Sequence, residues 1–106
     1  GKGIGDTKVC SKMCVGKTEE QIAEEFETGD IIVVPQTSNR LLQFMRKARA
    51  IITEAEGVNS HAAIVGMTLG IPVITGCKNA ASILKNGTTV VVDAEKGIVY
   101  SGDRVN

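Results

Sequence analysis

The sequence has few aromatic residues, no net charge and no long apolar run, and each absence excludes a class of function. Phenylalanine, tyrosine and tryptophan make up 3% of the chain, with no tryptophan, so a platform for stacked nucleic-acid bases is not expected. Twelve basic residues balance twelve acidic ones, and a neutral chain is poorly suited to nonspecific binding of nucleic acid or membrane surfaces. No apolar run approaches the roughly 18 residues of a membrane span. We therefore expect no nucleic-acid partner and no membrane partner.

The three cysteines do not form the pattern of a disulfide framework or of a metal site. Their count is odd, unlike the paired cysteines of small secreted domains. Cys10 and Cys14 lie in the alternating segment VCSKMCV, which predicts a strand with both on one face, about 13 Å apart. That distance is too long for one shared tetrahedral metal. We predict no metal site, ordinary buried or half-buried thiols, and a cytoplasmic protein.

The length and the apolar content indicate one domain. The chain has 106 residues, of which 42% are hydrophobic, enough for a single core without covalent staples. Residues 1–8 are glycine-rich and predict a linker or a lead-in strand. We expect one domain over residues 9–102, followed by a short tail over residues 103–106.

Short strands and helices alternate along this domain. The expected strands cover residues 9–15, 31–34, 50–53, 72–75, 88–93 and 98–101, and the expected helices begin near residues 18, 38, 60 and 79. Such alternation is typical of an α/β fold. The last two strands are joined by a hairpin-length loop over residues 94–97, so the sheet is predicted to be mixed rather than wholly parallel.

The single histidine, His61, stands where a helix is expected to begin. A strand ends at Thr53, a loop follows, and the helix starts at Asn59 or Ser60. The free N–H groups of a first helical turn, here near Asn59, Ser60 and Ala62, favour a bound anion. The positive end of the helix dipole disfavours a charged imidazolium, so a neutral ring suited to carry phosphate is one interpretation. A surface or capping histidine without chemistry is the other.

The segment around His61 resembles a known family signature. EGVNSHAAIVGMTLGIPVITG is similar to the mobile, swivelling phosphohistidine domain of enzymes that use phosphoenolpyruvate, where a Ser-His or Cys-His pair precedes Gly-Ile-Pro and a closing glycine. The resemblance covers Gly3 to Gly102. It implies a swivelling β/β/α domain, layered with a mixed sheet and three to four short helices, and it implies that His61 is the phosphoacceptor.

A second segment of the resemblance concerns Thr37. The run GDIIVVPQT is similar to an earlier strand of the family, which ends in a threonine whose hydroxyl approaches the histidine. Thr37 would then fix the tautomer of the ring through a hydrogen bond. A role as a helix-capping or turn residue is the alternative for Thr37.

Departures from the family pattern point to a narrower group. Met67 stands in place of an arginine, Glu56 in place of the first glycine of a pair, and Asn59 in place of a threonine. Arginine suits bidentate phosphate contacts, whereas methionine has no donor. Gly66-Met67 and the opening KTEEQIAEEFETGDIIVVPQT resemble the extra C-terminal domain of bacterial pyruvate kinases. The resemblance implies a homotetrameric parent that moves phosphate from phosphoenolpyruvate to ADP with magnesium and a monovalent cation. The extension itself would need no cofactor and have no kinase activity.

Three functions stay open at this stage. The first is a structural or regulatory module that packs on the parent kinase domains or on a neighbouring subunit. The second is a phosphohistidine carrier of the pyruvate phosphate dikinase or phosphoenolpyruvate synthase type, with His61 as acceptor. The third is a module that binds a small anion, phosphate or sulfate, without covalent transfer. If Ile64 or Val65 faces the core, its replacement by alanine should lower the free energy of unfolding by roughly 1–4 kcal/mol.

Overall fold

A computed structural model of the chain describes residues 2–5, 8–55, 61–78, 80 and 84–101. It contains seven strands, three α-helices and one short 3-10 helix within these residues. The strands are β1 (Lys2–Ile4), β2 (Lys8–Val15), β3 (Ile31–Val34), β4 (Ala50–Thr53), β5 (Val73–Thr75), β6 (Thr89–Asp93) and β7 (Ile98–Ser101). The helices are α1 (Glu19–Glu25), η1 (Asn39–Leu41), α2 (Leu42–Met45) and α3 (His61–Leu69).

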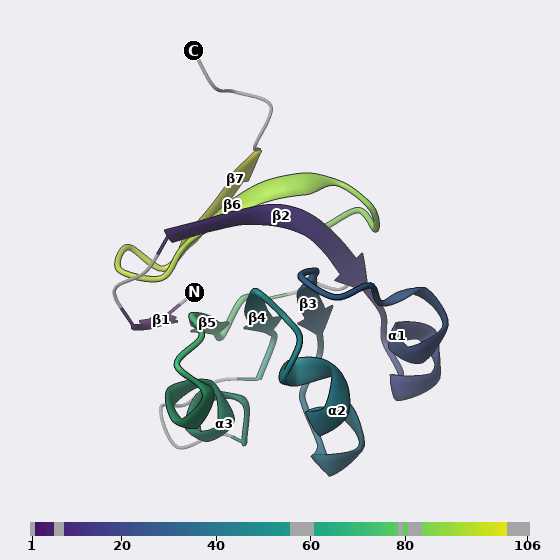
Figure 1. Cartoon of the computed structure of the whole chain (residues 1–106). Helices are drawn as coiled ribbons and strands as arrows, with labels where there is room; N and C mark the ends of the chain where they lie inside the picture. Colours follow the sequence, from purple (N-terminus) through teal and green to yellow (C-terminus); the bar gives the residue numbers. More distant parts are fainter. Residues whose placement is uncertain (1, 6–7, 56–60, 79, 81–83, 102–106) are drawn as a thin grey trace.

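The seven strands form one mixed sheet with the order β1-β5-β4-β3-β2-β6-β7. Strands β2, β3, β4 and β5 run parallel to one another. Strand β1 pairs antiparallel with β5, β6 with β2, and β7 with β6. Strand β2 bends and belongs to both the parallel and the antiparallel part of the sheet: Lys8 to Lys12 pair with β6, and Met13 to Val15 pair with β3. The result is a layer of β2, β6 and β7 above the central strands, with the helices below (Figure 1).

The central parallel strands are buried on both faces. All four residues of β3 and all four of β4 are buried, as continuous apolar runs predict for strands covered from two sides. Alternate residues point to opposite faces of a strand, so Ile32 and Ile51 face one apolar cluster while Ile31 and Ile52 face another. These two clusters divide the core of the domain in two.

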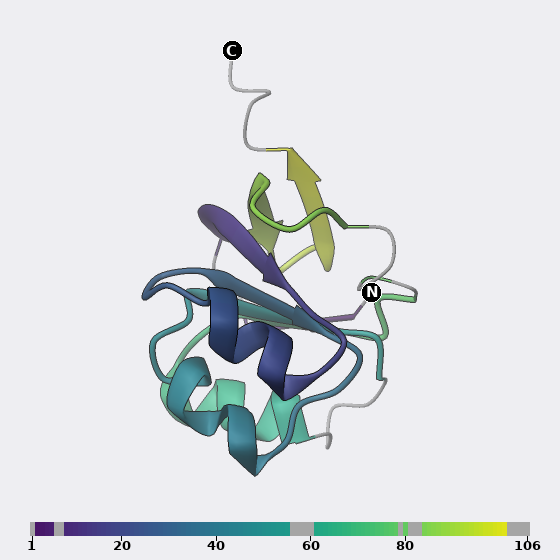
Figure 2. The same cartoon turned by 90° about the vertical axis from the view of Figure 1, so that its right-hand side faces the viewer.

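The helix-side core is the cluster between the central strands and the helices. Its buried members are Cys14, Ile22, Ile32, Val34, Leu41, Met45, Ala48, Ile51, Ala62 and Val73. The strand-side core lies between the central strands and the upper layer, which Figure 2 shows from the side. Its buried members are Met13, Ile31, Val33, Ala50, Ile52, Ile74, Ala80, Val90 and Val92. A β/β/α layering follows directly from these two clusters.

The observed elements confirm the α/β prediction, the mixed sheet and the short helices. The glycine-rich start contains a strand, β1, which pairs with β5. Helix α1 begins near residue 18 as predicted, and the Thr18 hydroxyl caps it by accepting a hydrogen bond from the Gln21 N–H at 3.3 Å. The helix expected to begin at Asn79 falls largely outside the described residues.

Helix α3 lies close to the sheet because it has a glycine at the contact. A Cβ atom added to Gly66 would overlap the Val73 side chain of β5. Ala62, Ala63 and Gly66 are buried, and Val65 packs at the edge of the helix-side core. Ile64 does not: it is 50% exposed, so of the two core positions considered, only Val65 packs inward.

Within the described part of the chain, no helix has both the length and the apolar character that crossing a membrane requires.

Candidate functional site

The candidate site lies where the parallel strands β3 and β4 end. Ligands of α/β sheets commonly bind outside the carboxyl ends of the strands. The loops at this edge are tied to one another: the Ala55 N–H donates to the Pro35 carbonyl at 2.9 Å, and the Cys77 N–H donates to the Thr53 carbonyl at 2.9 Å. This edge is therefore held by backbone hydrogen bonds that link the segments after β3, β4 and β5.

His61 is the first residue of α3 and is half-buried at this edge, as the sequence predicts for a ring in the first turn. Its Nδ1 lies 2.7 Å from the Thr37 hydroxyl oxygen. Its Nε2 lies 3.0 Å from the side-chain oxygen of Asn39. Thr37 follows β3 and Asn39 begins η1, so two residues of one segment, the connection between β3 and η1, contact the ring.

These contacts define which ring nitrogen carries the proton in a neutral ring. An amide oxygen only accepts hydrogen bonds, so the Nε2 of His61 must donate to Asn39. The Nδ1 then has the free lone pair and accepts from the Thr37 hydroxyl. Protons are assigned here from the hydrogen-bond network. The arrangement is the Nε2–H tautomer, fixed from both sides.

A pocket of about 120 Å³ adjoins the histidine. Its lining residues are Gln36, Thr37, Thr53, Ala55, His61 and Ala62. The volume is several times the roughly 30 Å³ that one water occupies in the liquid, so a small anion or a few waters fit. None of these described lining residues is a lysine or an arginine, so this part of the pocket wall supplies hydroxyls and a ring rather than positive charge.

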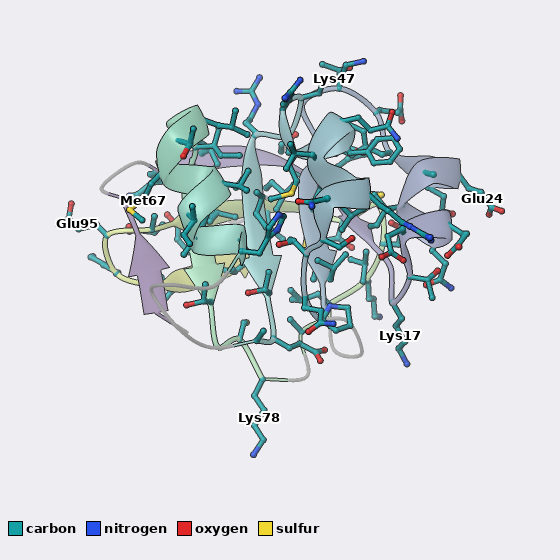
Figure 3. All side chains as sticks on the ribbon, turned by 90° about the horizontal axis from the view of Figure 1, so that it is seen from below. Lys17, Glu24, Lys47, Met67, Lys78 and Glu95 are labelled. Carbon is teal, nitrogen blue, oxygen red and sulfur yellow. The ribbon has the colours of Figure 1, made fainter. Side chains whose placement is uncertain are left out.

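Met67 does not contribute to this pocket. It is 59% exposed and points outward from α3, away from α2 (Figure 3). A thioether also has no donor for a phosphoryl oxygen. The other sequence differences, at Glu56 and Asn59, and the predicted anion-binding residues Asn59 and Ser60 lie outside the described residues. Ala62, the third predicted anion-binding residue, is buried and lines the pocket.

Asn39 was not predicted from the sequence as a partner of His61. The sequence indicates only a helix that begins near residue 38, and η1 begins at Asn39. The available signal was its spacing: Asn39 stands two residues after Thr37, the residue expected to contact the ring. An amide at that distance from an anchored hydroxyl can reach the same imidazole.

Metal ligands are not grouped in the described residues. No set of three or more histidine, cysteine, aspartate or glutamate side chains there is close enough to hold an ion. Cys10 is exposed, Cys77 is half-buried and Cys14 is buried, and all three are free thiols.

Comparison with protein families gives one match over most of the chain. Residues 26–97 match the family described as "PEP-utilising enzyme, mobile domain". The match includes Thr37, Asn39 and His61, and therefore the whole described hydrogen-bond network.

Similar proteins fall into two groups by name. The chain is 45% identical over 102 residues to pyruvate kinase 2 of Synechocystis sp., covering 96% of this chain and 17% of that protein. It is 42% identical over 103 residues to a probable phosphoenolpyruvate synthase of Archaeoglobus fulgidus, covering 95% of this chain and 14% of that protein. The chain thus spans about a sixth of the length of these relatives.

A solved structure supports the same fold. The solution structure of an enzyme I protein (nEIt) is similar with a TM-score of 0.62 and 28% sequence identity. The similarity covers 74% of this chain and 32% of that chain. The layered α/β architecture is therefore shared with part of this enzyme I structure.

Proposed function

The chain belongs to the family of PEP-utilising enzyme mobile domains, and we propose that it is the C-terminal extension domain of a bacterial-type pyruvate kinase. In this proposal it acts as a structural or regulatory module that retains a phosphohistidine-type site. The parent would transfer phosphate from phosphoenolpyruvate to ADP in the cytoplasm, with magnesium and a monovalent cation bound by its other domains. The extension itself would hold no cofactor and catalyse no reaction.

One observation carries this proposal: similarity to proteins named pyruvate kinase extends over nearly the whole chain. Identities are 45% to the Synechocystis protein and 43% to that of Geobacillus stearothermophilus, each over 96% of this chain. Two features of the site favour a non-carrier role. The Asn39 side-chain oxygen contacts Nε2 of His61, and Met67 provides no cation for a phosphoryl group.

As a module, the domain would pack on the kinase domains of its own chain or of a neighbouring subunit in a homotetramer. Removing residues 1–106 from the full-length protein is then expected to lower its thermal midpoint, alter its assembly or change its response to effectors. Turnover at saturating substrates should be retained, because the chemistry belongs to the other domains. Steady-state kinetics, thermal unfolding and sedimentation of the truncated and intact proteins measure this.

A matched control for the deletion is the full-length protein with Ile64→Ala, which changes an exposed side chain and leaves the domain in place. It should behave as the intact protein does in turnover. Loss of turnover on deletion, with a folded kinase remaining, would contradict the proposal.

A phosphohistidine carrier is the second candidate, and two observations favour it. Proteins named phosphoenolpyruvate synthase are 41–45% identical to this chain, and the Thr37 hydroxyl is 2.7 Å from the ring. In a carrier, the bond between the enol oxygen and phosphorus breaks, a bond from ring nitrogen to phosphorus forms, and the enolate takes up a proton to become pyruvate. This candidate predicts a phosphoryl group on His61.

A further inference from the structure

Asn39 contacts the ring nitrogen that faces away from Thr37. We propose that Asn39 is a positioning residue that holds His61 in the Nε2–H tautomer and covers Nε2, so that neither ring nitrogen is a free nucleophile in the resting site. The inference rests on the retained phosphohistidine-type site of the proposed function. Asn39 would thereby keep Nε2 of His61 inaccessible to an electrophile.

The first step is geometric. The side-chain oxygen of Asn39 lies 3.0 Å from Nε2, and the hydroxyl of Thr37 lies 2.7 Å from Nδ1. Both distances are within the normal range for hydrogen bonds. Because the two partners sit on opposite sides of the imidazole, they fix the rotation of the ring as well as the position of its proton.

The second step is that the segment bearing Asn39 is itself anchored. The Asn39 carbonyl accepts from the Leu42 N–H, and the Ser38 hydroxyl donates to the Glu19 carboxylate at 3.0 Å. The pKa of Glu19 is lowered by a hydrogen bond from its own backbone N–H and by that of Ser38, so this carboxylate stays charged at neutral pH. Asn39 thus reaches the ring from a segment that is hydrogen-bonded to both α1 and α2.

The third step is chemical. In the Nε2–H tautomer, Nε2 has no lone pair in the ring plane, and the lone pair of Nδ1 is engaged by Thr37. A nucleophilic Nε2 requires the proton on Nδ1, which would then donate to the Thr37 oxygen, since a hydroxyl both donates and accepts. It also requires that the Asn39 oxygen move away. Breaking the Asn39 contact is therefore the event that opens the ring to an electrophile.

The test uses the fact that His61 is the only histidine in the chain. Diethylpyrocarbonate acylates a neutral imidazole nitrogen, forming a nitrogen–carbon bond and releasing ethanol and carbon dioxide, and the ultraviolet absorbance of the product reports on this one residue. Asn39→Ala is expected to raise the acylation rate about three- to tenfold, the factor that corresponds to one neutral hydrogen bond. Two-bond proton–nitrogen NMR spectra of the wild-type chain should show Nε2 protonated and Nδ1 unprotonated.

Two variants control the experiment. Asn39→Asp keeps an acceptor oxygen at the same reach and should restore the slow acylation of the wild type. If Asn39 had only a structural role, this rescue would not be expected. Gln43→Ala removes an exposed amide from α2 that contacts no part of this pocket, and its rate should equal that of the wild type.

A wild-type ring protonated on Nδ1, or an unchanged rate in folded Asn39→Ala, would overturn the inference. Neither readout involves phosphoenolpyruvate or a parent enzyme. Failure here would leave the deletion experiment and the proposed function standing, and failure of the deletion experiment would leave the ring geometry standing.

Discussion

Replacing Ile51 by alanine is expected to lower the free energy of unfolding by about 2–5 kcal/mol, the usual range for a large aliphatic side chain truncated in a rigid core. Ile51 is fully buried in β4, where it pairs with Ile32 on one side and Val73 on the other. Its side chain belongs to the helix-side core. Because strands and helices surround the site, the cavity cannot collapse easily. Urea denaturation of the two chains measures the loss.

Ile64→Ala is the matched control for this prediction. It removes the same atoms from a side chain that is 50% exposed on α3, so the expected loss is below about 1 kcal/mol. Equal losses for the two variants would contradict the assignment of β4 to the centre of the sheet.

Raising the pH from 9 to 11 is expected to lower the free energy of unfolding by about 2 kcal/mol through ionisation of Cys14. Burial, followed by the charges of Asp30 and Glu25, raises the pKa of Cys14 to about 11 from 9.0, with Lys12 acting in the opposite direction. A raised pKa means that the folded state holds the thiol proton more tightly than the unfolded chain does. The stabilisation is complete below pH 9 and is lost as the pH rises to about 11.

The measurement is the unfolding free energy in reducing buffer across this pH range. Other groups titrate there, so the comparison that isolates Cys14 is between two variants. Cys14→Ala should flatten the decline by about the amount given above, because it removes the buried thiol. Cys10→Ala, on the exposed part of the same strand, should leave the decline as in the wild type. A decline of unchanged steepness in Cys14→Ala would show that the thiol does not ionise in this way.

The sequence predicts the elements of the central layer well, for a physical reason. Runs such as residues 31–34 and 50–53 are apolar at every position, which only a doubly covered strand accommodates. The loop before the last strand contains Gly97, whose φ of 68° suits glycine. The terminal hairpin could therefore also be predicted from the sequence. These local signals sufficed for an α/β fold with a mixed sheet.

Long-range features could not be predicted in the same way. The pairing of β1 with β5 joins a glycine-rich segment to a distant strand, and nothing local in residues 1–8 specifies that partner. Helix α3 has the sequence HAAIVGMTL, which is apolar on nearly every side. Without a polar face, the sequence does not show that Val65 packs inward and Ile64 outward. Tertiary contacts with the sheet decide it.

The candidate site, too, could be predicted only in part from the sequence. His61 at a helix start follows from local pattern, and its contact with Thr37 followed from the family resemblance. The contact with Asn39 depends on how the end of β3 meets the start of α3, a relation between segments 22 residues apart. A contact of this kind between distant segments follows from the three-dimensional structure and not from the local sequence.

The most direct test of a module that retains the site without carrying phosphate is labelling of the full-length protein with radioactive phosphoenolpyruvate. We expect no acid-labile, base-stable label on His61 above that in His61→Ala, under conditions in which an active carrier domain of the family is labelled. A phosphoryl group on wild-type His61 that disappears in His61→Ala would contradict this account and establish the domain as a carrier.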